Sequence, residues 1–75
     1  MVYVACSNSG VLIGTKDSEK AKHVVESTYL SDLTDADGNE VSLDYWIEVY
    51  DEKNIVGIID FNKETLEFSS EFLKM

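Results

Sequence analysis

The sequence predicts an α+β fold, in which one helix packs on one face of a small, mainly antiparallel sheet of four to five strands, in the order β-β-α-β-β-β. Three observations lead to this prediction. One segment repeats its apolar residues at helical spacing, several short runs are apolar or alternate in polarity as strands do, and the 75 residues form a single domain, 1–75. One helix covers only one face of such a sheet, so the other face is either solvated or an interface.

The first two strands are predicted over residues 2–6 and 11–14, because both runs are apolar and β-prone. The Ser-Asn-Ser-Gly cluster at 7–10 is a turn signal between them. We therefore expect the two runs to form a hairpin.

A helix is predicted over residues 18–30. Asp17 and Ser18 are both candidates for the N-cap, since either side chain can accept from the free backbone N–H groups of the first turn. Glu19 then lies in the first turn, where its charge is favourable against the helix dipole. The apolar stripe recurs at i, i+3, i+4, i+7 and i+8 and consists of Ala21, Val24, Val25, Thr28 and Tyr29.

The rest of the chain is predicted as a loop over 32–39, with Asp37-Gly38 as its turn signal, and three more strands over 43–50, 55–61 and 65–69. In the last strand Leu66 and Phe68 are expected to face inward, and Phe72 and Leu73 to fold back onto the core. Side chains alternate along the strand 43–50, and which side the helix covers stays open. One side carries Tyr45, Ile47 and Val49, and the other carries Asp44, Trp46, Glu48 and Tyr50.

Charge is the most informative feature of the composition. Fifteen acidic residues stand against six lysines and no arginine, which gives a net charge of −9. Such a chain repels nucleic acid and anionic membranes and attracts basic surfaces. No lysine lies between Lys22 and Lys53, while nine acidic residues do. The alternative interpretation is a solvated surface that keeps a small protein soluble.

The sequence offers little evidence for a catalytic site or a metal site. Cys6 is the only cysteine, which excludes an internal disulfide, and together with His23 it supplies two of the four ligands that a structural zinc ion needs. A Cys6–His23 catalytic pair would also need an orienting third group and an oxyanion hole. Asp35, Asp37 and Gly38 resemble the middle of a calcium loop, but a strand is predicted after them where an EF-hand needs a helix. We therefore expect no enzyme activity, no cofactor and no metal.

The side of strand 43–50 that carries Trp46 and Tyr50 is the predicted binding surface. Alternate residues on a strand lie about 6.6 Å apart, comparable to the spacing of successive phosphates, and Trp and Tyr are frequent anchors of interfaces. Acidic residues of the preceding loop and the following turn would extend the surface. The predicted partner-binding residues are Asp32, Asp35, Asp37, Glu40, Asp44, Trp46, Glu48, Tyr50, Asp51 and Glu52.

These features predict a non-enzymatic inhibitor that blocks a nucleic-acid-binding protein or complex, such as a nuclease, by occupying its basic surface. In size, acidity and compactness the chain resembles the small anti-defence proteins of phages and mobile elements, which include anti-CRISPR and antirestriction proteins. The partner is then a protein with a basic surface, and neither nucleic acid nor membrane is bound directly.

The alternative is an assembly module or accessory subunit that forms a homodimer, or docks on another chain, through its uncovered sheet face. Binding of that kind would be insensitive to salt. The apolar run 2–6 is too short for a signal peptide, and no apolar stretch approaches the roughly 18 residues of a membrane span. We expect a cytoplasmic protein, in the host cytoplasm if a phage encodes it.

Overall fold

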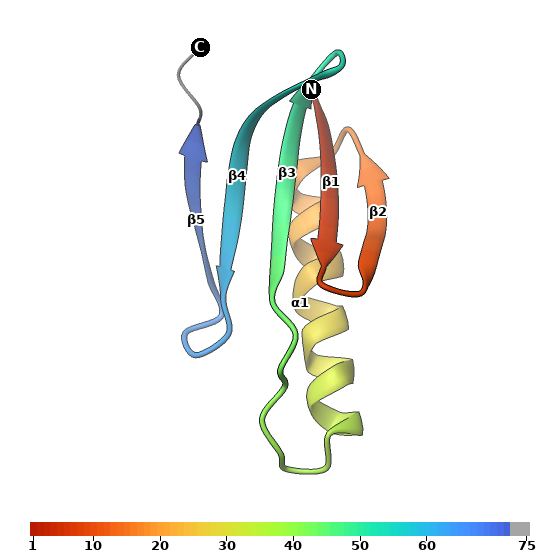
Figure 1. Ribbon diagram of the computed structural model, residues 1–75, viewed down its shortest axis with the longest axis vertical. Coiled ribbons are helices and arrows are strands. Elements are labelled where there is room, and N and C mark those ends of the chain that lie inside the picture. The colour runs from red at the N-terminus through yellow and green to blue at the C-terminus, as the bar shows by residue number, and fades with distance from the viewer. Residues whose placement is uncertain (73–75) are drawn as a thin grey trace.

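The computed structural model describes the backbone of residues 1–72 and the side chains of residues 1–69, and it confirms the predicted α+β fold. Residues 1–72 form one helix and five strands: β1 (Val2–Ser7), β2 (Gly10–Thr15), α1 (Ser18–Asp35), β3 (Tyr45–Asp51), β4 (Asn54–Asn62) and β5 (Glu67–Phe72). The strands make one antiparallel sheet in the order β2-β1-β3-β4-β5. The helix crosses behind the sheet and connects the edge strand β2 to the central strand β3 (Figure 1).

The predicted N-terminal hairpin is confirmed, and β2 contains a bulge that places two successive residues against the core. Ala5 pairs with Ile13 and Cys6 with Val11, so Leu12 is the extra residue on β2. Leu12 and Ile13 both pack against the core cluster. The hairpin turn ends at Gly10, whose φ of 135° is readily adopted by glycine and is strained for other residues.

Helix α1 begins as the sequence predicts. The Asp17 side chain is the N-cap and accepts hydrogen bonds from the backbone N–H groups of Glu19 at 3.0 Å and Lys20 at 3.3 Å. Within the predicted stripe Ala21, Val25 and Tyr29 are buried, and the other two residues are half-buried. The stripe is therefore the face of α1 that packs on β1, β2 and β3.

The predicted end of the helix was wrong. We expected a loop over 32–39, but α1 continues to Asp35 and Ala36 is its C-cap. No proline or glycine lies between Ser18 and Asp37. The helix ends where Asp37 (φ 52°) and Gly38 (φ 85°) adopt left-handed backbone angles. The Asp-Gly pair thus follows the helix directly, whereas it was expected to be the turn signal of a longer loop.

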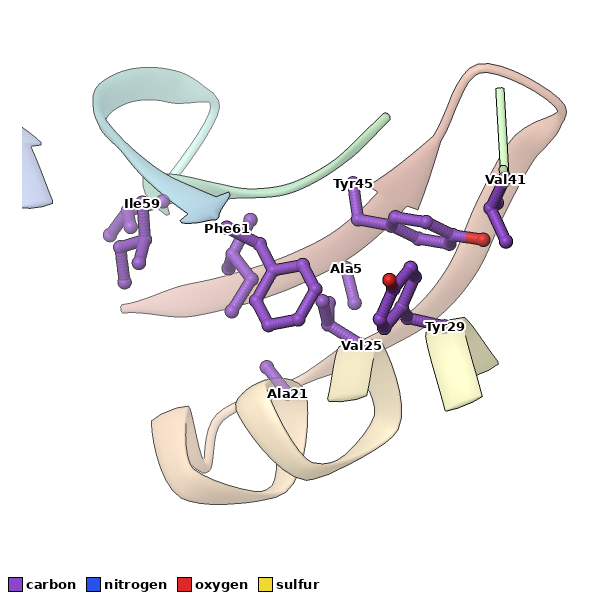
Figure 2. Packing of buried hydrophobic residues seen from close by; sticks show 10 residues of the cluster. Ala5, Ala21, Val25, Tyr29, Val41, Tyr45, Ile59 and Phe61 are labelled. Atoms are coloured by element: carbon purple, nitrogen blue, oxygen red, sulfur yellow. The ribbon is translucent and has the colours of Figure 1, made fainter. Parts of the chain in front are cut away.

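The core lies between α1 and one face of the sheet, and it contains the neighbouring rings of Tyr29, Tyr45 and Phe61 (Figure 2). Tyr29, Tyr45 and Phe61 meet edge to face, with ring centroids 5.6 to 6.2 Å apart, an arrangement that aromatic pairs favour. Ile47 and Val49 are completely buried beside them. Tyr45, Ile47 and Val49 therefore form the side of β3 that the helix covers.

The segment before β3 and the turn after β4 both differ from the prediction. Strand β3 starts at Tyr45 rather than at 43, because the irregular chain before it is held by Lys63, whose Nζ donates to the carbonyls of Val41 at 2.9 Å and Leu43 at 2.8 Å. Leu66 was expected to face inward, but it lies in the β4–β5 turn with a φ of 60° and is exposed.

The inward orientation of Phe68 is confirmed, since its ring centroid lies 5.0 Å from that of Phe61. The Phe72 side chain and Leu73, which were expected to fold back onto the core, lie outside the described part of the structure.

A buried tyrosine makes the fold sensitive to alkaline pH. Tyr45 is almost fully buried and donates its hydroxyl to the Asp32 carboxylate. Burial, then this hydrogen bond and the Asp32 charge, raise the pKa of Tyr45 well above its ordinary value of 10.0. The unfolded chain ionises this tyrosine near pH 10, so its stabilising contribution is present below about pH 10 and is lost as pH rises further.

Replacing Tyr45 with phenylalanine should therefore flatten the alkaline part of the stability profile. We expect Tyr45→Phe to cost about 1 kcal/mol at neutral pH and to reduce the further loss in free energy of unfolding above about pH 10. Urea unfolding across that pH range measures both effects. Tyr3→Phe is the matched control, since it removes a hydroxyl from β1 and leaves the Asp32 bond intact. An unchanged alkaline slope in Tyr45→Phe would contradict the assignment.

Candidate protein-binding face

The sheet face opposite α1, here named the open face, is covered by no other element in residues 1–72. In Figure 1 the helix lies behind the sheet, so the open face is turned toward the viewer. Because paired residues share a side of a sheet, the register places thirteen described side chains on this face. They are Val2, Val4 and Cys6 on β1, Val11 on β2, Trp46, Glu48 and Tyr50 on β3, Ile55, Ile58, Asp60 and Asn62 on β4, and Glu67 and Ser69 on β5.

The centre of the open face is a row of three residues along β3. Trp46, Glu48 and Tyr50 are all half-buried. The Trp46 indole Nε1 donates to Glu48 Oε2 at 3.0 Å, and the Tyr50 hydroxyl donates to Glu48 Oε1 at 2.7 Å. The hydrogen bond from Tyr50 to Glu48, followed by partial burial and the Glu48 charge, raises the pKa of Tyr50. The carboxylate is thus held in place from both sides by aromatic neighbours.

Apolar residues flank Glu48 and Tyr50 on the neighbouring strands, whereas Trp46 has Asp60 beside it on β4. Val4 on β1 and Ile58 on β4 pair with Glu48, one on each side. Val2 and Ile55 pair with Tyr50. When a partner covers this face and excludes water from the carboxylate, a cation that reaches it interacts more strongly than it would on a fully hydrated surface.

Cys6 lies at the edge of this apolar setting, paired with Trp46. Burial raises the pKa of its thiol, and the negative charge of Glu48 raises it further. The thiol donates to the Val4 carbonyl at 3.4 Å. Its neighbour Ala5 points into the core, so Cys6 is on the face away from α1, whereas His23 is exposed on α1. The two residues therefore lie on opposite sides of the sheet and form no pair.

The predicted binding residues fall into three separate groups. Trp46, Glu48 and Tyr50 are together on the open face. Asp51 and Glu52 are exposed at the β3–β4 turn, where Glu52 has a φ of 56°. The remaining acidic residues lie at the opposite end of the molecule, which is 41 Å long. These are Asp32 and Asp35 on α1, and Asp37, Glu40 and Asp44 between α1 and β3.

Two of these acids are engaged in the fold. Asp32 lies on the helix side of the sheet and accepts from Tyr45. Asp44 was expected on the same side of the strand as Glu48, but it lies just before β3 and its Oδ1 is 3.6 Å from Lys63 Nζ. The predicted row of Asp44, Trp46, Glu48 and Tyr50 is therefore shortened to its last three residues. Asp44 and Asp51 are separated by roughly 23 Å of chain, and Glu48 is the one carboxylate of β3 on the open face.

Sequence reasoning missed the contribution of β1 and β4 to this face. Val4, Cys6, Ile58 and Asp60 reach it only through the register of strands that are distant in sequence. Alternation within each strand was the available signal, but it does not say which alternate set shares a side with Glu48. The thirteen open-face residues include three carboxylates, Glu48, Asp60 and Glu67, and no lysine, arginine or histidine.

In the described residues no pocket is present, and no three His, Cys, Asp or Glu side chains gather as metal ligands would. The helix of residues 1–72 is not long and apolar enough to cross a membrane. Comparison of the chain with protein-family models, curated proteins and solved structures finds no match. What the open face can do therefore has to follow from its own chemistry.

Proposed function

We propose that this chain is a non-enzymatic binding protein that covers a basic surface of a partner protein with its open face. The observation that supports the proposal best is the Trp46–Glu48–Tyr50 row, which offers two aromatic anchors and a fixed negative charge on a face that α1 leaves uncovered. Aromatic side chains concentrate binding energy in protein interfaces. A charged centre selects a partner of opposite charge.

The acidic residues away from the open face have a different role in this proposal. Asp51 and Glu52 at one end, with Asp35, Asp37 and Glu40 at the other, are exposed. Together with the net charge of −9 they attract a basic partner over a distance and accelerate association, while salt screens them. A surface basic enough to be attracted is the kind that binds nucleic acid, so the partner is a nuclease or another nucleic-acid-binding protein, and binding blocks its nucleic-acid site.

Capture from bacterial lysate on the immobilised protein tests this proposal. We expect a nucleic-acid-binding protein to be retained at about 0.1 M salt and released at about 1 M. The Debye length falls from roughly 10 Å to roughly 3 Å between these two concentrations, so the added salt screens the attraction. Added nucleic acid should compete with the retained protein. Retention of a salt-resistant neutral protein, or of this chain alone, would instead favour the assembly module.

A further inference from the structure

We infer, on the basis of the proposed function, that the partner anchors itself with an arginine whose guanidinium pairs with Glu48 between the rings of Trp46 and Tyr50. The first reason is the arrangement of acceptor sites on the carboxylate. A carboxylate has about four lone-pair sites, two on each oxygen. Trp46 occupies one on Oε2 and Tyr50 one on Oε1. One site is left on each oxygen, so the two N–H groups of a guanidinium can bind both oxygens at once.

The flanking rings are the second reason for arginine over lysine. Trp46 and Tyr50 stand on either side of Glu48 on the same face of β3, each about 6.6 Å along the strand. A guanidinium is planar and weakly hydrated, so it stacks on aromatic rings and enters an apolar setting at a lower cost than an ammonium ion. Val4 and Ile58 provide that apolar setting on the two neighbouring strands.

A second copy of this chain does not fit the same site. The chain contains no arginine, and none of the thirteen open-face residues is basic. A symmetric dimer through this face would bring the Glu48 and Asp60 carboxylates of the two copies together across an apolar interface. Like charges brought together in this way oppose association. Charge complementarity therefore assigns the site to an arginine of another protein.

Nuclear magnetic resonance titration of the whole chain tests the arginine site directly, because Trp46 is the only tryptophan and its indole N–H reports on Glu48. The probes are two short peptides that differ only in one residue, arginine or lysine, placed between leucines. We expect the arginine peptide to shift the Trp46 indole signal and to bind about tenfold more tightly than the lysine peptide. Glu48→Gln should weaken the arginine peptide about tenfold or more.

The controls separate this inference from the proposed function. Glu64→Gln removes an exposed charge from the β4–β5 turn and should leave peptide binding unchanged. A dispersed amide spectrum shows that each variant is folded. Equal affinity for the two peptides, or shifts confined to the acidic segment 35–44, would overturn the arginine site. If a salt-sensitive partner is captured equally well by Glu48→Gln and Glu64→Gln, the arginine site is wrong while the general binding function stands.

Discussion

Replacing Ile47 with alanine should remove a large part of the stability of this fold. Ile47 has no exposed surface and lies in the central strand beneath α1. Truncating a buried isoleucine to alanine costs about 2 to 5 kcal/mol, because apolar contacts are lost and a cavity remains. A domain of 75 residues has a total free energy of unfolding of roughly 4 to 11 kcal/mol. We therefore expect Ile47→Ala to be partly unfolded or close to it, as measured by urea unfolding.

Ile58→Ala is the matched control, since it makes the same change on the other side of the same sheet. Ile58 is half-buried on the open face, and we expect its loss to cost about 1 kcal/mol. Equal costs at the two positions would mean that something covers the open face in solution. Sedimentation at several protein concentrations would then show whether a second copy does so.

Reversing the charge of Glu48 should have the largest effect on partner binding. Glu48→Lys replaces the fixed carboxylate with an ammonium group at the centre of the open face and removes the acceptor of Trp46 and Tyr50. Breaking one member of a desolvated charge pair costs 2 to 5 kcal/mol or more. We expect the affinity for the captured partner to fall about 100-fold or more, mainly through faster dissociation. Surface plasmon resonance with the purified partner measures both rate constants.

Glu64→Lys changes the net charge by the same amount in the exposed β4–β5 turn. If steering by the overall charge explained binding, the two variants would lose affinity equally and mainly through slower association. Similar losses in both variants would thus rule out the open face as the docking surface. A normal urea unfolding curve for Glu48→Lys shows that its loss does not come from unfolding.

Much of the fold could be predicted from local patterns. The hairpin, the Asp17 cap, the stripe of Ala21, Val25 and Tyr29, and the alternation along β3 all depend on residues a few positions apart. The errors occurred where a distant contact or a backbone angle decides. Strand β3 starts late because Lys63 holds the chain before it, and Leu66 is exposed because the turn requires a positive φ.

The same distinction between local patterns and distant contacts applies to the candidate site. The sequence by itself determined that Trp46, Glu48 and Tyr50 share one side of a strand, because side chains alternate along any strand. The tertiary structure decided that this side is uncovered, because Tyr45, Ile47 and Val49 pack under α1 with Phe61. The tertiary structure also pairs Asp32 with the Tyr45 hydroxyl and Asp44 with the Lys63 ammonium group. Burial and ion pairing depend on partners far along the chain, so a pattern of neighbouring residues could not indicate them.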